Sequence, residues 1–270
     1  MAKKDNGSVI PADISTGIMV MDEEMLEVLG EDGLGINILP HIELKHAGTV
    51  AFGFQDAESE DDETIVVGSA GFDAVILHMH RVRSYWEKGF DERDASDPFP
   101  DCSSVDARTG ISRAGEEQVS CKGCPHNEWG SGAGNGKACA EKMRMFLLVK
   151  DSSLPRFFQA PTTSITACEV YHVQMRDKGR HYWNVVTHFG AEKATRAKGG
   201  IEFSKLTLSK VGDISDEDAA RLEPMRAMCK LGSKQTRVSD AQEDKGSKDA
   251  GKEVRDSNAA DEGDDPFGDE

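Results

Sequence analysis

Four cysteines between Cys102 and Cys139 constrain the fold of this 270-residue chain more than any other stretch of its sequence. Eighteen residues separate Cys102 from Cys121, two separate Cys121 from Cys124, and fourteen separate Cys124 from Cys139. The central Cys-Lys-Gly-Cys is a tight turn from which two thiolates reach one tetrahedral Zn²⁺ at about 2.3 Å. The residues between the cysteines are mostly small, polar or turn-forming, so they offer little apolar surface to bury. The spacing therefore predicts one structural zinc ion, whose binding supplies folding free energy to this segment.

Other uses of these cysteines fit the sequence less well. Two disulfides would need an oxidising compartment, and no apolar signal segment precedes the cysteines. A redox-active Cys-x-x-Cys would open a helix, whereas Pro125 and a glycine-rich run follow Cys124. His126 is an alternative ligand in place of Cys102, the most distant of the four. The remaining pair, Cys168 and Cys229, stand among apolar neighbours and are expected to be buried thiols.

Motifs that would indicate catalysis are incomplete. The run GSGAGNGK, residues 130–137, is similar to a phosphate-binding loop, but Ala138 stands where Ser or Thr would bind Mg²⁺. His126 and Glu128 follow the Cys-x-x-Cys pair, whereas zinc deaminases carry His-x-Glu before it. Four cysteine ligands would also leave no open position for a catalytic water. We expect a protein without enzymatic activity, with a zinc-containing endonuclease as the catalytic alternative.

Charge is segregated along the chain, which the overall value of −17 hides. Residues 1–76 carry a net charge of −13, residues 77–238 carry +4, and residues 239–270 carry −8. Within the middle block, residues 130–210 reach +7. A basic centre between acidic ends suits a polyanion-binding protein whose own tail competes for the binding surface. The alternative is that the acidic ends only keep the protein soluble.

The alternation of apolar and turn-forming residues predicts a mainly β chain of the α+β class. We expect a flexible lead (1–20), a core (21–231) with the zinc-stapled insertion at about 100–140, and a disordered acidic tail (232–270) without apolar periodicity. Short strands and glycine-rich turns favour an OB-like Greek-key barrel. The first residues contain two lysines but no apolar segment, and no apolar run is long enough for a membrane span. We therefore expect a soluble cytoplasmic protein.

The expected elements follow from local patterns. Strands are expected at His41–Lys45, Thr49–Phe54, Thr64–Val67, Phe72–Arg83, Met143–Val149 and Phe203–Lys210, and a hairpin from Ile165–Met175 and His181–Phe189. Within Phe72–Arg83, simple alternation places Val75, Leu77 and Met79 on one face and Ile76, His78 and His80 on the other. The stretch Arg156–Ala160, between two prolines, is expected to be a loop. Helices are expected at Asp22–Leu29 and Ser215–Leu231, the second capped by Ser215 and interrupted by Pro224.

Arginines and lysines are interleaved with aromatic residues in several places, which is what a groove for single-stranded nucleic acid needs: cations for phosphates and aromatic faces for bases. The alternative for each aromatic residue is a place in the core. The expected phosphate contacts are Arg81, Arg83, Lys137, Arg144, Lys178, Arg180, Lys193, Arg196 and Lys198, and the expected stacking residues are Tyr85, Trp86, Trp129, Tyr182 and Trp183.

Two stretches resemble known families. The end of the chain, DDPFGDE, resembles the protein-docking tails of bacterial and phage single-stranded DNA-binding proteins, although here three residues follow the Phe. The stretches VILHMHRVRSYW, CSSVDARTG, CKGCPHNEWGSG and MFLLV, within about residues 70–190, resemble a family of zinc-containing phage proteins that bind single-stranded DNA. This resemblance implies an OB-type core, zinc at the four cysteines, and work in viral DNA replication, recombination or repair inside a host cell.

The tail resemblance implies that Asp264, Asp265, Pro266 and Phe267 bind replication or recombination proteins. The alternative function is that of a zinc-stapled viral interaction protein that holds a host polymerase or nuclease through its acidic ends.

Overall fold

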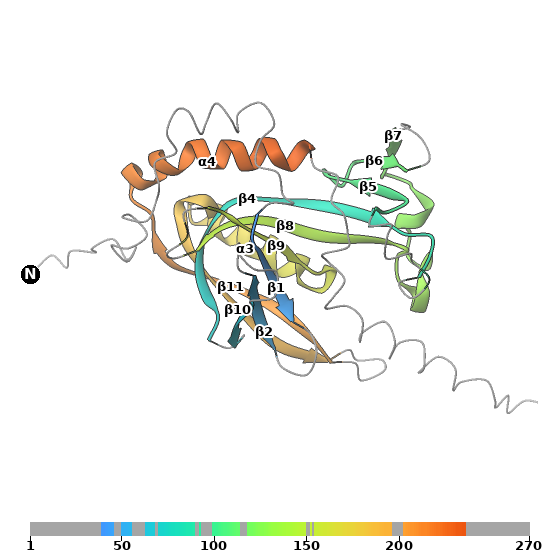
Figure 1. Ribbon diagram of the computed structural model, residues 1–270, viewed down its shortest axis with the longest axis horizontal. Helices are drawn as coiled ribbons and strands as arrows, with labels where there is room; N and C mark the ends of the chain where they lie inside the picture. The colour runs from blue at the N-terminus through green and yellow to red at the C-terminus, as the bar shows by residue number, and fades with distance from the viewer. Residues whose placement is uncertain are drawn as a thin grey trace, which may run out of the picture.

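The computed structural model describes residues 39–45, 50–55, 63–67, 70–89, 92, 99–113, 118–149, 152, 154–195 and 202–235. At its centre lie two long antiparallel strands, β4 (Phe72–Tyr85) and β8 (Cys139–Val149), which pair from Ala74 opposite Val149 to Tyr85 opposite Cys139 (Figure 1). The expected lead, the helix Asp22–Leu29, and the tail from residue 236 onward lie outside the described residues.

The strands form one mixed sheet whose main path is open in the described residues. Its order is β3-β2-β1-β9-β8-β4-β5-β6-β7, and in the described part of the chain β1 and β9 are the one parallel pair. A second hairpin, β10 with β11, joins the sheet where β10 pairs with the beginning of β4. The remaining strands are β1 (His41–Lys45), β2 (Ala51–Gln55), β3 (Glu63–Val67), β5 (Cys102–Ser104), β6 (Thr109–Ser112), β7 (Gln118–Ser120), β9 (Arg156–Ala160), β10 (Val185–Thr195) and β11 (Glu202–Asp213).

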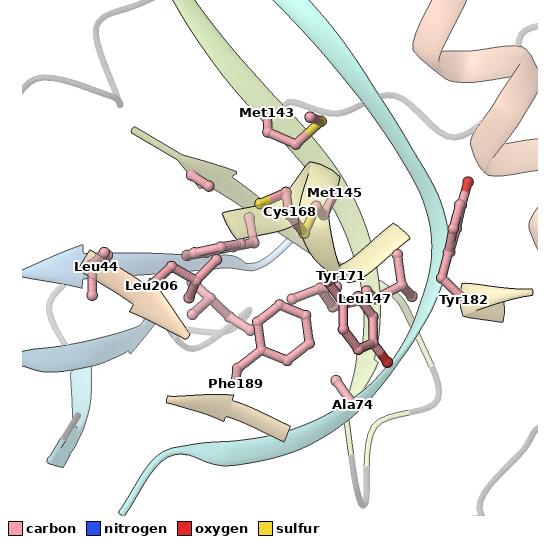
Figure 2. Packing of buried hydrophobic residues seen from close by; sticks show 14 of the residues in the cluster. Leu44, Ala74, Met143, Met145, Leu147, Cys168, Tyr171, Tyr182, Phe189 and Leu206 are labelled. Atoms are coloured by element: carbon pink, nitrogen blue, oxygen red, sulfur yellow. The ribbon is translucent and has the colours of Figure 1, made fainter. Parts of the chain in front are cut away.

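A helix covers each face of the central strands, as Figure 1 shows. On one face, α3 (Ile165–Asp177) packs through Tyr171 and Met175 into a cluster with Met145 and Leu147 of β8, shown in Figure 2. On the other face, α4 (Asp216–Gln235) packs in a second cluster. This cluster contains the side chains of β4 and β8 that point away from α3. Both faces of β4 and β8 are therefore apolar along much of their length, and each fully buried Leu, Phe or Met side chain contributes about 1.5–3 kcal/mol.

A β-bulge in β4 changes which face its side chains reach. Ile76 pairs with Leu147 and His78 pairs with Phe146, so Leu77 is an extra residue in the ladder. After the bulge, Met79 packs against the α3-side cluster, while His78 and His80 stack near Phe146 on the α4 side. The expected alternation, with Leu77 and Met79 on one face, is wrong for this reason.

The expected hairpin of Ile165–Met175 with His181–Phe189 is also wrong. Residues 165–177 form α3, because the buried residues Ile165, Cys168, Tyr171 and Met175 recur every three or four positions and meet the sheet on one helix face. The turn that follows has Gly179 at φ +66°, and the strand after it, β10, pairs with β11 instead. The stretch Arg156–Ala160 is strand β9 rather than a loop, since it lies between β1 and β8.

The predicted helix after Ser215 is confirmed, with Pro224 inside it rather than ending it. Its cap is also confirmed: the Asp218 N–H donates to Ser215 Oγ over 3.1 Å, and that hydroxyl donates to the Asp218 carboxylate over 2.6 Å. The helix continues to Gln235, four residues into the region expected to be tail.

The mainly β composition is confirmed, but the pairing is an open mixed sheet and does not show a closed Greek-key barrel. In the part of the chain that the structure describes, no helix has the length and apolar character that crossing a membrane requires.

Candidate metal centre

Strand register places two of the four cysteines on either side of one tyrosine. Tyr85, at the end of β4, lies opposite Cys102 of β5 on one side and opposite Cys139 of β8 on the other. Residues that face each other across antiparallel strands project to the same face of a sheet. From Cys139 onward, every second residue of β8 projects toward α3, as Met143 and Met145 do. Cys102 and Cys139 therefore flank Tyr85 on the α3 face.

A glycine allows the third cysteine to approach. Gly110 of β6 lies opposite Val119 of β7, and a Cβ at Gly110 would stand 2.9 Å from Cys102 Sγ and 3.7 Å from Cys121 Sγ. Two residues after Val119, the Cys121 N–H donates to the Arg108 carbonyl over 2.8 Å and closes this hairpin. Because glycine has no side chain, position 110 leaves room for the thiols of Cys102 and Cys121 to approach each other.

The fourth cysteine is held by the turn that follows. Gly123 has φ +76°, a conformation that favours glycine, and it reverses the chain between Cys121 and Cys124. The Asn127 N–H then donates to the Cys124 carbonyl over 3.0 Å, and the Asn127 side-chain amide donates to the Cys121 carbonyl over 3.3 Å. Backbone and side chain of one asparagine therefore fix both ends of the Cys-x-x-Cys turn.

All four thiols line one small cavity of about 30 Å³, together with Tyr85 and His126. The six cysteines of the chain are free thiols. Among the described residues, no group of three or more His, Cys, Asp and Glu side chains is arranged so that it could hold a metal ion as it stands. The thiols share a pocket but are not drawn into a closed ligand shell. Their chemistry fits Zn²⁺, because soft thiolates in sets of four are its usual structural ligands.

The surroundings of Cys102 and Cys139 disfavour the thiolate form. Burial raises the pKa of Cys102, and the neighbouring Cys121 and Cys124 raise it further. Burial raises the pKa of Cys139 to about 11, against the opposing effect of the Arg83 guanidinium. Four thiolates in one cavity would repel each other, so a divalent cation is the group that would stabilise them together.

His126 lines the same cavity and stacks on Tyr85, with ring centroids 3.8 Å apart and an angle of 21° between the planes. His126 therefore stays an alternative ligand in place of Cys102. The stack also ties the short helix η3 (Pro125–Asn127) to the end of β4.

The loop after η3 presents Trp129 to solvent. Ser131 Oγ lies 2.7 Å from the Glu128 carbonyl and accepts the Ala138 N–H over 3.0 Å. The N–H groups of Gly130 and Gly132 both donate to the Gly136 carbonyl over 3.0 Å. These bonds hold the loop although the Trp129 side chain is 80% exposed. The Lys137 ammonium lies 5.3 Å from the centre of the Trp129 ring and 3.2 Å from Asn127 Oδ1.

Two predicted phosphate contacts are held in an ion-pair network on the α3 face. Arg81 pairs with Glu141 at 2.6 Å and with Glu169 of α3, and Arg83 pairs with Glu141 at 3.1 Å. Glu141 lies two residues after Cys139, so the network runs from the candidate metal centre to helix α3. Both arginines already have anionic partners inside the protein.

The other residues that the sequence singled out are not brought to one surface. Arg144 is 5% exposed and Tyr182 is 6% exposed, so burial removes both from contact with a nucleic acid as the chain is folded here. Lys178 and Arg180 are exposed after α3, where Arg180 lies 3.5 Å from Asp213. Of the rest, Lys193 pairs with Glu202 at 2.5 Å, Trp86 is half-buried, and Arg196, Lys198 and the tail residues Asp264–Phe267 lie outside the described residues.

The close approach of the thiols at Gly110 has a signal in the sequence. A glycine inside a strand often marks a close backbone approach, and Gly110 lies in the strand Thr109–Ser112, between two cysteine-bearing segments. The residues around Gly110 in the sequence do not indicate which side chains approach it.

Replacing Gly110 with valine should lower the affinity for zinc about 10- to 100-fold, as disturbing the shell around a metal site usually does. The new side chain would overlap Cys102 Sγ and separate it from Cys121. Competition with a chromophoric chelator measures the affinity. The matched control is Thr109→Val, an exposed neighbour on the same strand, which should leave the affinity unchanged. Equal affinities of the two variants would contradict the role of Gly110.

The metal centre and the loop bearing Trp129 are the features that bear most directly on function. No protein-family model, no curated protein and no solved structure matches this chain.

Proposed function

We propose that this protein binds single-stranded DNA, and that one zinc ion at Cys102, Cys121, Cys124 and Cys139 fixes the loop that presents Trp129 to a base. The observation that carries the proposal is the combination of an 80% exposed indole ring and a cation beside it, on a loop tied by several hydrogen bonds. A rigid aromatic platform next to a lysine suits one nucleotide: the ring stacks on the base and the ammonium meets a phosphate.

The predicted contacts differ in how readily they would serve this function. Trp129, Lys137, Lys178 and Arg180 are accessible to a ligand in the structure. Arg81 and Arg83 would have to exchange Glu141 and Glu169 for phosphates, which costs part of the gain. Fewer phosphates would therefore be neutralised than the count of predicted cations suggests.

The wider role belongs to the same proposal. The protein would protect single-stranded DNA during viral replication, recombination or repair in a host cytoplasm, without catalysis, and recruit partner proteins through Asp264–Phe267. An OB-type core, a zinc-stapled insertion and a disordered tail remain predictions from the sequence. The zinc ion would be structural: the thiolates hold it, and its part is to fix the loop.

One observation favours the second candidate function, a protein-interaction factor. On α3, Val170 is 49% exposed and Val173 is 66% exposed, three residues apart on one helix face. A small apolar patch of this kind suits a protein partner rather than DNA.

Titration with oligo-dT separates the two functions. If the proposal is correct, the fluorescence of the three tryptophans is quenched on binding, and the logarithm of affinity falls linearly with the logarithm of salt concentration. Absence of both quenching and binding at low salt would contradict it. A parallel titration with oligo-rU measures the choice between DNA and RNA.

Deleting residues 239–270, which carry a net charge of −8, should tighten DNA binding at low salt, by up to about tenfold, and abolish recruitment of partner proteins. The reason is that the acidic tail competes with DNA for basic surface. The difference in affinity should shrink as salt screens the charges. The control keeps the length and replaces the acids of residues 256–270 with their amides; it should tighten binding as well. Unchanged affinity in both variants would rule out the competition.

A further inference from the structure

The second half of helix α4 is a basic surface that the sequence analysis did not single out. Residues 226–235, RAMCKLGSKQ, contain three cations and no Asp or Glu. Arg226, Lys230 and Lys234 are spaced four apart, so they follow one face of the helix at intervals of about 6 Å. We call these three residues the α4 row. The helix is anchored by other residues, Met225, Met228 and Cys229, which lie in the cluster against the sheet.

Two members of the α4 row have no counter-charge in the described part of the chain. Lys230 and Lys234 are exposed and make no ion pair there, whereas Arg226 pairs with Glu223 at 2.7 Å. Burial and then the charges of Lys230, Arg226 and Lys234 lower the pKa of His78 to about 4. All three cations therefore lie near one small region above β4.

The first member of the row meets an aromatic stack. The Arg226 guanidinium carbon lies 4.0 Å from the centre of the Trp183 ring. The His181 ring lies parallel to Trp183, with centroids 4.2 Å apart and 7° between the planes. His181 and Trp183 are both half-buried. Cations in a row beside a stack of rings at the protein surface are the two elements of a surface for single-stranded nucleic acid.

We infer that the α4 row is a second contact for the backbone of single-stranded DNA, in which Lys230 and Lys234 bind phosphates and the His181–Trp183 stack receives a base. This inference rests on the proposed function and adds helix α4 to the contacts expected from the sequence. An acidic peptide would satisfy the lysines but would leave the ring stack unused, which is why DNA suits the whole surface better. Cations near a helix C-terminus also stabilise the helix through its dipole, so binding must be measured separately from stability.

The test is the full chain carrying Lys230→Gln and Lys234→Gln, titrated with oligo-dT over a range of salt concentrations. Each phosphate contact on a single strand contributes about 0.7 to the slope of log affinity against log salt, so the slope should become shallower by about 1.4. Thermal unfolding followed by circular dichroism should show a midpoint close to that of the unmodified protein. The matched control is Lys205→Gln with Lys210→Gln on β11, where both lysines have acidic partners; its slope should be unchanged.

The outcomes separate this inference from the proposed function. If the unmodified protein binds oligo-dT and the Lys230 and Lys234 variant keeps the same slope, the α4 row is not a DNA contact and the proposed function stands. If the variant binds DNA more tightly, the row holds the acidic tail instead, and the inference is overturned. If the unmodified protein does not bind at all, both fail.

Discussion

Replacing Cys121 and Cys124 with serine should remove the zinc ion and unfold the segment from Cys102 to Cys139. Zinc supplies roughly 10 kcal/mol or more to the folding of small thiolate sites, and serine hydroxyls do not replace thiolates as ligands. Little apolar burial supports this segment: β7 is exposed throughout, and Val119 is 38% exposed. Metal analysis should find one zinc per chain in the unmodified protein and none in the variant. Limited proteolysis should then cleave within residues 102–139.

The central strands should survive this change, because their cores do not depend on the metal. Met145, Leu147 and Tyr171 are at most 2% exposed on the α3 side, and the second cluster lies on the far face. The far-ultraviolet circular dichroism of the variant should therefore keep most of its intensity. Full retention of zinc by the double-serine variant would contradict the assignment of the ligands.

Cys168→Ala is the matched control for the loss of a thiol. Cys168 is fully buried in α3, away from the four cysteines expected to bind zinc, and burial raises its pKa to about 12. Its removal should lower the free energy of unfolding by about 1 kcal/mol through the cavity it leaves. The variant should keep one zinc per chain. Loss of zinc in this control would mean that zinc content reports general instability rather than ligation.

The turn between Cys121 and Cys124 could be predicted because its signal is local. The spacing of Cys121 and Cys124 and the glycine between them describe a turn that needs no distant partner. The strand register that places Cys102 and Cys139 beside Tyr85 could not be predicted. It depends on the pairing of β4 with two strands that are distant in the sequence. Register is set by tertiary packing, which a single sequence does not display.

The errors in secondary structure have the same origin. In α3, the residues Ile165, Cys168, Tyr171 and Met175 fit a helical period, while the β-branched Val170 and Val173 between them suggest a strand. Burial against the sheet decided in favour of the helix, and the valines were left exposed. The bulge at Leu77 was equally invisible, because one extra residue changes the face of every residue after it without changing the composition.

The exposure of the residues expected to contact nucleic acid was the least predictable feature. Arg144 and Tyr182 have the residue types that bind DNA. Arg144, however, donates to Gln159 over 3.3 Å and packs on Phe157, and Tyr182 is 6% exposed in the core. A residue type indicates what a side chain can do, whereas exposure decides whether it can reach a ligand. Lys230 of α4 shows the opposite case: it is exposed, but the sequence pattern indicated only that it belongs to a helix.

Replacing Trp129 with alanine should weaken binding of oligo-dT by about 1–3 kcal/mol, which is roughly 5- to 150-fold. The ring is the most exposed large apolar side chain among the described residues, so its removal costs the folded protein almost no packing. The loop should keep its shape, because its hydrogen bonds run between Ser131, Gly136 and backbone groups rather than through the indole. Zinc content and thermal midpoint should therefore match those of the unmodified protein, while affinity and most of the fluorescence quenching are lost.

Trp129→Phe is the control that distinguishes stacking from other effects of the substitution. Phenylalanine keeps an aromatic face beside Lys137 and should retain much of the affinity, although it removes the fluorescence of that position. Binding of this variant is measured by fluorescence anisotropy of a labelled oligonucleotide, which does not depend on tryptophan. If Trp129→Ala bound as tightly as the unmodified protein, the exposed ring would not be a base platform. The zinc-held loop would then have to serve a different partner, for which the apolar face of α3 would be the next surface to test.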